Sequence, residues 1–245
     1  MASESKLRQL WAVAYYLGFI PMLRNPLFLA FLFISPFTLL FILFVASEGA
    51  ALPYGIAGAL TMTTCELGLF VGTDLATYKI QNKFQDFAIA SPVTPLMYML
   101  GVALSEIIFG APALLVLFIL MAIQGATASA LVATLGVVLL LWVATTAIGF
   151  FFSAYAPSTQ NAFIINGFIT TILSVLPPVY YPISLLPSWL VPVAMVLPTT
   201  VAASMFQGAL GLGYSIAPII SLAILCAQAV ILLLLVSFRM KWRET

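Results

Sequence analysis

The sequence contains no histidine, and this absence excludes several kinds of catalytic site. Without an imidazole there is no Ser–His dyad, no HExxH zinc site and no histidine-ligated haem or quinol site. A phosphate-binding loop needs glycine followed by Lys and then Ser or Thr, and none of the lysines follows a glycine. We therefore expect a chain that is not an enzyme and that binds no metal, nucleotide or other cofactor.

Charge is also scarce, because only 6% of the residues are charged whereas 64% are hydrophobic. Soluble domains carry about 25% charged residues, so a soluble globular fold is excluded. A bilayer core about 30 Å thick needs about 20 apolar residues per helix. We predict an all-α integral membrane protein with a single transmembrane domain over residues 1–245. The six predicted transmembrane helices are residues 27–46, 52–76, 97–123, 130–154, 162–176 and 216–238.

The two cysteines, Cys65 and Cys226, both fall inside these apolar segments. We interpret them as small packing residues and not as a disulfide. The first apolar segment begins after Pro26 and is about 20 residues long, whereas the apolar part of a signal peptide is about 7–15 residues long and lies near the terminus. We therefore expect no cleaved signal peptide.

The eight Lys and Arg residues fall in three short patches, which lie at the start of the chain, at Lys79 and Lys83, and at the end of the chain. Because Lys and Arg are retained on the cytoplasmic side, we expect all three patches to face the cytoplasm, which requires an even number of crossings. The chain is then a multi-pass protein of the plasma membrane. Its few basic residues follow this topology, so the net charge of +1 gives no reason to expect nucleic acid as a partner.

The segment before the first predicted span, residues 1–25, is amphipathic. Its apolar residues recur at the spacing of one helix face; they are Leu7, Leu10, Trp11, Ala14 and Tyr15. We predict a helix that lies in the cytoplasmic interface with its apolar side against membrane lipid. Arg24, Asn25 and Pro26 then turn the chain into the bilayer, because proline is tolerated at a helix start.

A second amphipathic segment, residues 77–89, follows the second predicted span. Lys79, Asn82, Lys83 and Asp86 lie opposite an apolar face that includes Phe84, which predicts a short helix on the cytoplasmic surface. Pro92 closes it, because the residue before proline is pushed out of the helical region. The segment is either an ordinary interfacial loop helix or a docking element for a cytoplasmic partner.

Residues 177–200 form an apolar external stretch with six prolines. Non-helical backbone at membrane depth survives only where protein buries it or a wet cavity hydrates it. We therefore predict a re-entrant segment of short broken helices that dips part-way into the membrane and returns.

Glu66 and Glu106 are acidic residues within predicted spans, and they are expected at similar depth, about 15 Å from the cytoplasmic face. A charge there costs at least ~2.5 kcal/mol, so each should face the bundle interior or a wet cavity. With no intramembrane Lys, Arg or His, they are protonated, hydrogen-bonded or matched by a cationic substrate. Asn166 and Thr170 are further polar candidates for a pathway, although such groups more often form contacts between helices.

These features together resemble the membrane subunits of type-2 ABC exporters, the permease family that includes antibiotic-resistance and polysaccharide exporters. The resemblance covers nearly the whole chain and depends on ordered motifs. These are Arg24-Asn25-Pro26, Ser91-Pro92-Val93, Pro178-Val179-Tyr180-Tyr181-Pro182 and Leu186-Pro187-Ser188-Trp189-Leu190. The chain departs from the family pattern at Lys83, where members often have Gly, and at residues 197–200, which replace the commoner Asn-Pro.

The resemblance implies a half-transporter that moves an amphipathic or hydrophobic substrate, such as a drug, an antibiotic or a lipid-like molecule, out of the cell. A second copy of the chain, or a paralogous permease, would complete the pathway, and helices 1 and 5 would form the contact between the two subunits. A dimer of separate ABC ATPase subunits would bind ATP and Mg. Residues 77–89 would be the coupling helix that meets this ATPase. The external gate candidates are Pro178, Tyr180, Tyr181, Pro182, Pro187 and Trp189.

Two rival functions stay open on the sequence alone. A gradient-driven secondary transporter or channel would use Glu66 and Glu106 as proton or cation sites. It would transport its substrate in the absence of ATP, and Glu→Gln at either position would abolish this transport. A non-transporting scaffold would tolerate both substitutions.

Overall fold

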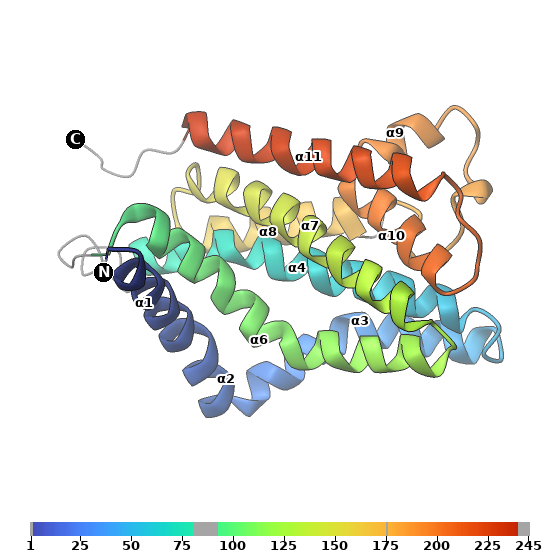
Figure 1. The fold of residues 1–245 in the computed structure, drawn as a ribbon, viewed down its shortest axis with the longest axis horizontal. Helices are drawn as coiled ribbons and strands as arrows, with labels where there is room; N and C mark the ends of the chain where they lie inside the picture. Colours follow the sequence, from blue (N-terminus) through green and yellow to red (C-terminus); the bar gives the residue numbers. More distant parts are fainter. Residues whose placement is uncertain (1, 81–92, 175, 240–245) are drawn as a thin grey trace.

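The computed structural model describes residues 2–80, 93–174 and 176–239 and is helical throughout its regular parts (Figure 1). The long helices are α3 (Pro26–Ala46), α4 (Leu52–Ile80), α6 (Pro95–Ile123), α7 (Ala128–Ser153), α8 (Thr159–Ser174) and α11 (Pro218–Arg239). The shorter ones are α1 (Ala2–Ala14), the π-helical turn η1 (Tyr15–Phe19), α2 (Ile20–Arg24), η2 (Ile183–Leu185), α9 (Val191–Met195) and α10 (Pro198–Ala209).

Each of the six predicted spans corresponds to one long helix. Among the described residues, α4, α7, most of α6 and the greater part of α11 are long and apolar enough to cross a membrane. The protein is therefore a helical integral membrane protein. α8 has 16 residues and reaches about 24 Å, which is shorter than a bilayer core of about 30 Å. In α3 the apolar stretch Pro36–Ala46 is shorter than a membrane span.

The predicted boundary between the second span and the coupling helix at residue 77 differs from the observed one. α4 continues through Ile80, so residues 77–80 form the last turn of the membrane helix. An apolar run that ends in Thr77 and Tyr78 offers no helix breaker, and nothing in the local sequence stops the helix there. Residues 81–89 of the predicted coupling helix lie outside the described residues.

α4 is the central helix of the bundle, since 89% of its apolar stretch is buried, against 22% for α11. Its main neighbour is α7. Gly68 and Gly72 lie against Thr145 and Gly149 of α7 so closely that a Cβ at either glycine would overlap that helix. The close packing predicted from this small-xxx-small pair is confirmed. Both cysteines are free, as expected, and Cys65 is fully buried.

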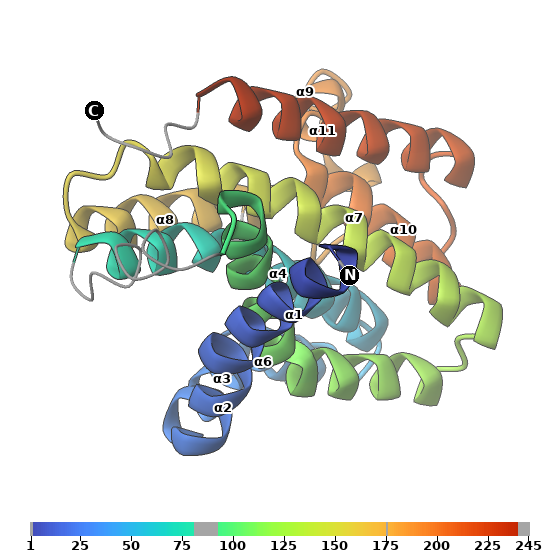
Figure 2. The same cartoon turned by 60° about the vertical axis from the view of Figure 1, so that its left-hand side comes forward.

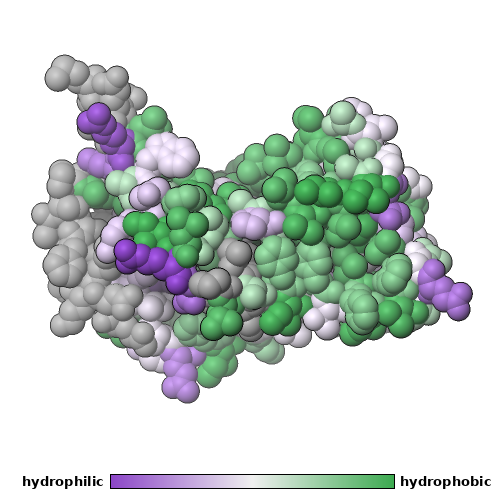
Figure 3. Space-filling model, turned by 90° about the horizontal axis from the view of Figure 1, so that it is seen from below, coloured by the Kyte–Doolittle hydropathy of each residue, from purple (hydrophilic) through white to green (hydrophobic). Residues whose placement is uncertain are grey.

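The hydrophilic residues lie mainly at the two ends of the helical bundle (Figure 3). The start of α6, the C-terminal ends of α4 and α11, and helix α1 all lie at the left-hand end in Figure 1, and Figure 2 shows α1 packed across α6. The surface between the ends is mostly hydrophobic, with hydrophilic residues toward either end (Figure 3). Along α1 and η1, the apolar residues Leu7, Trp11 and Tyr15 are exposed.

Candidate functional site

Three residues of the central helix α4 are partly exposed and lie on one narrow stripe of its surface. Between residues 55 and 76, every residue is buried except Glu66, Phe70 and Asp74. Residues four apart lie on one face of a helix, so these three side chains form a single stripe about 12 Å long. An acid, an aromatic ring and a second acid thus share the one face of α4 that the rest of the chain leaves partly open. We call these three residues the α4 stripe.

Glu106 lies beside Asp74 and not beside Glu66. The Asp74 and Glu106 carboxyl groups are within hydrogen-bonding reach of each other, and the Tyr78 hydroxyl donates to Asp74 Oδ2 at 3.1 Å. Two carboxyl groups share a hydrogen bond only when one of them carries a proton. The pair therefore holds a proton between α4 and α6 at the lower end of the stripe.

The expected similar depth of Glu66 and Glu106 does not match this geometry. Because α4 ends at Ile80, Glu66 lies about 20 Å from that end, whereas Glu106 lies about 16 Å from the start of α6. Leu67 packs on Gly110, one turn beyond Glu106. Glu66 therefore sits farther into the bundle than Glu106 by about one helical turn, and farther than Asp74 by about two turns.

The neighbour of Glu66 is Tyr180, which belongs to residues 177–200. We call these residues the external segment, after the side of the membrane that the sequence predicts for them. The Tyr180 hydroxyl donates to Met62 Sδ at 3.2 Å, and Met62 lies one turn from Glu66 on α4. Burial raises the pKa of the Tyr180 hydroxyl above its usual range, and the nearby Glu66 carboxyl raises it further. The hydroxyl therefore stays protonated as a donor above the upper acid of the stripe.

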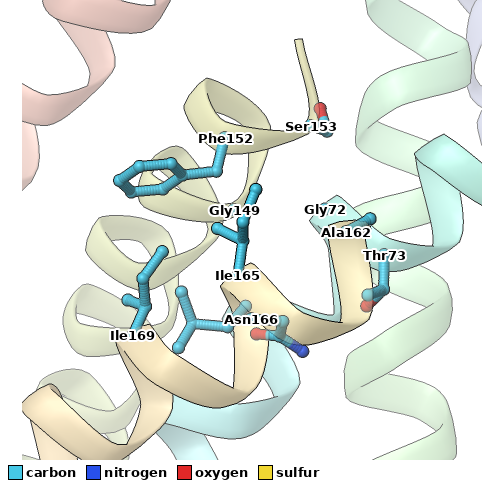
Figure 4. Close-up of a pocket in the computed structure, with 10 residues that line it drawn as sticks. Gly72, Thr73, Gly149, Phe152, Ser153, Ala162, Ile165, Asn166 and Ile169 are labelled. Carbon is cyan, nitrogen blue, oxygen red and sulfur yellow. The ribbon is translucent and has the colours of Figure 1, made fainter. Parts of the chain in front are cut away.

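A small cavity of about 10 Å³, roughly room for one water molecule, opens between α4, α7 and α8 (Figure 4). Thr73 of α4 and Asn166 of α8 line it, together with Gly149 and Phe152 of α7. The Thr73 hydroxyl donates to the Phe70 carbonyl oxygen at 2.8 Å. The Asn166 Oδ1 is buried and has no hydrogen-bond partner in the described part of the chain, so the cavity presents a free acceptor. Thr170 lies one turn farther along α8 and is half-buried.

Two glutamine amides hold the external segment to the bundle. Gln207 of α10 is buried, and its Nε2 donates to the carbonyl oxygens of Val179 and Tyr181, both at 3.3 Å. Gln228 of α11 donates in the same way to the carbonyl oxygens of Met195 and Val196, both at 3.0 Å. Each amide thus satisfies two carbonyls that the irregular backbone leaves without helical partners.

The predicted gate residues do not share one environment. Pro178 is buried, Tyr180, Tyr181 and Pro182 are half-buried, and Pro187 and Trp189 are exposed. The outer half of the proline-rich motif therefore lies on the surface of the single chain. Its inner half packs on α4 and α10.

The described part of the coupling segment ends with Lys79, which is exposed in the last turn of α4. The other predicted coupling residues, Asn82, Lys83, Phe84 and Asp86, lie outside the described residues.

Sequence reasoning gave no pathway role to Asp74, Phe70 or Gln207. The i, i+4, i+8 spacing of Glu66, Phe70 and Asp74 was visible in the sequence, but a stripe of three matters only when the rest of the helix is buried. Gln207 is a lone amide in an apolar run directly after the proline-rich stretch, and its partners are 26 and 28 residues away.

Comparison with curated proteins found no match to the chain. The family comparison did find one. The model of the ABC-2 type transporter family matches residues 8–210, so it spans α3 to α10 and with them the α4 stripe, the cavity and the external segment. The chain belongs to the ABC-2 type transporter family of membrane permeases.

Proposed function

We propose that the chain is the membrane subunit of an ATP-driven exporter that moves an amphipathic or hydrophobic substrate out of the cell. The observation that carries the proposal is the α4 stripe, because it leaves two acids and a phenyl ring partly open on an otherwise buried central helix. Intramembrane acids are costly and face a bundle interior or a cavity. A helix that only held the fold together would have no need of them.

The proposed topology has six crossings with both chain ends in the cytoplasm of a plasma-membrane protein. Support comes from the basic residues, because α1, the end of α4 and the end of α11 carry Lys or Arg and lie at one end of the bundle (Figure 1). The exposed apolar residues of α1 and η1, Leu7, Trp11 and Tyr15, fit a helix that rests on membrane lipid. The external segment at the other end is the proposed re-entrant element.

A second copy of the chain, or a paralogous permease, would complete the pathway. α8 is short and packs mainly on α4. Its other face exposes Phe163, Ile164 and Phe168. A second subunit against this face and against α3 would cover these residues and would enclose the stripe and the cavity between two chains.

The energy source in this proposal is a pair of separate ATPase subunits that hold ATP and Mg. They would dock on residues 77–89, where Lys79 marks the edge of the described surface. Closure of the ATPase would push on α4 and α6, the two helices that this segment joins. These are also the helices that the Asp74–Glu106 pair bridges.

Replacement of residues 81–89 by a Gly-Ser linker of equal length tests the docking assignment and leaves α4 intact. We expect the tagged permease to lose its ATPase partner on purification, while a permease in which the outer loop residues 124–129 are replaced keeps it. The measurement is the amount of partner that co-purifies from membranes. An ATPase that stays bound to the linker variant would contradict the assignment.

A gradient-driven transporter or channel with Glu66 and Glu106 as its proton or cation sites is the second candidate. The observation that favours it is that the Asp74 and Glu106 carboxyl groups lie within hydrogen-bonding reach of each other, where two carboxyl groups share a proton. This candidate predicts transport that follows a proton gradient in vesicles without ATP. Glu106→Gln would abolish that transport. Transport that requires ATP and persists without a gradient would exclude this candidate.

A further inference from the structure

The contacts of Tyr180 suggest a latch at the outer end of the α4 stripe. The Tyr180 ring lies directly on Gly58 of α4, and a Cβ at Gly58 would overlap the ring. The hydroxyl donates to Met62 Sδ one turn below. The side chain thus lies down along α4 toward Glu66, and the absence of a side chain at Gly58 is what makes room for it.

The backbone on both sides of Tyr180 is held by a single side chain. Gln207 Nε2 donates to the carbonyl oxygens of Val179 and Tyr181, the residues directly before and after Tyr180. Gln207 is 3% exposed and belongs to α10, which packs against both α4 and α7. A buried carbonyl that loses its donor is unfavourable, so this amide fixes the position of the Tyr180 backbone relative to the bundle.

We propose that Gln207 is a positioning residue that holds Tyr180 closed over Gly58, so that the external segment seals the α4 stripe from the outer side. The inference deepens the proposed exporter function, because a pathway from the cytoplasm needs a closed outer end before the substrate is released. Opening the latch requires the Gln207 amide to leave its two carbonyls or the Tyr180 ring to leave Gly58.

Cys65 can report whether the Tyr180 ring is closed over Gly58. Gly58, Met62 and Cys65 follow one another at the spacing of one helix face, so Cys65 lies below the Tyr180 ring. Cys65 is fully buried and free, and Cys226 is the second cysteine of the sequence. In a Cys226→Ser background, a charged methanethiosulfonate that does not cross membranes reports whether Cys65 is open to one side.

The experiment labels Cys65 in the full-length permease in intact cells and in inside-out vesicles. We expect slow labelling from both sides in the background protein. Gln207→Leu should label about tenfold faster from the outside and at an unchanged rate from the inside. Gly58→Ala should do the same through a different residue, because its methyl group displaces the ring. The two changes together should label no faster than either one, since both act through Tyr180.

Gln228→Leu is the matched control, since it removes an amide of the same kind from carbonyls at the far end of the segment. It should leave the labelling rate of Cys65 unchanged. Background rates in both Gln207→Leu and Gly58→Ala would overturn the latch, and so would faster labelling from both sides, which indicates general loosening. If Gln207→Leu does not fold, Gly58→Ala decides. The assay needs no ATPase, so loss of the latch and failure of ATPase docking are read separately.

Discussion

The half of α4 toward Ile80, here the inner half, and the half toward Leu52, here the outer half, differ in their polar contacts. The inner half presents the acids Glu66 and Asp74 from a regular helix whose backbone is already hydrogen-bonded. The outer half meets an irregular segment that brings unpaired carbonyls, and Gln207 and Gln228 supply the missing donors. The amides therefore satisfy backbone carbonyls that have no helical partner, whereas the backbone of α4 needs no hydrogen bond from the acids. Acids at membrane depth that the helix backbone does not require are candidates for function.

The largest expected effect is that of Glu66→Leu. ATP-driven transport should fall about 10- to 100-fold, because a charge-assisted contact of a substrate with Glu66 is lost. Thermal stability should rise, because a costly acid leaves the membrane interior. The measurements are uptake into inside-out vesicles and a melting curve in detergent. Glu48→Gln, which alters an exposed acid in the outer turn, should change neither.

A Glu66→Leu variant that is less stable than the wild type would contradict the proposed difference between the acids of α4 and the two glutamines. In that case the upper acid of the α4 stripe would be a structural residue like the glutamines.

A smaller effect is expected from the glutamines, and it concerns stability. Gln207→Leu should lower the free energy of unfolding by about 2 kcal/mol, because two buried carbonyls lose their donor. Gln228→Leu should cost about 1 kcal/mol, because its bond to the Val196 carbonyl is exposed and water can replace it. Melting temperatures of the two purified variants check this order. The reverse order would mean that α11, and not α10, anchors the external segment.

The smallest effect is expected for Asp74→Asn. The amide can still donate to Glu106 and accept from Tyr78, so stability should change by about 0.5 kcal/mol or less. The measurement is again the melting curve, with Asp74→Leu as the comparison variant that can make neither bond. A large loss for the Asn variant would show that the shared proton itself holds α4 against α6.

Much of the architecture could be read from hydrophobicity and helix-start residues. The six apolar runs, the Pro at the start of α3, α6 and α11, and the close approach at Gly68 and Gly72 all depend on local composition. The place where α4 ends was misjudged, because residues 77–80 are equally suited to a membrane helix and to a surface helix.

The candidate site was only partly predictable for a different reason. Glu66, Asn166 and Tyr180 stand out as polar or aromatic residues in apolar surroundings, and the sequence alone makes each of them a candidate. The contacts of Asp74 with Glu106 and of Gln207 with Tyr181 were not predicted, because they join segments that are far apart in the sequence and no local pattern records them.

The apolar composition alone commits this chain to the membrane and to helices, because no other arrangement of such residues can satisfy the backbone without water. Which acid pairs with which, and which ring lies on which glycine, follows from how far each helix extends and how its neighbours cross it. Those pairings depend on packing between distant segments, so they exist only in the folded bundle.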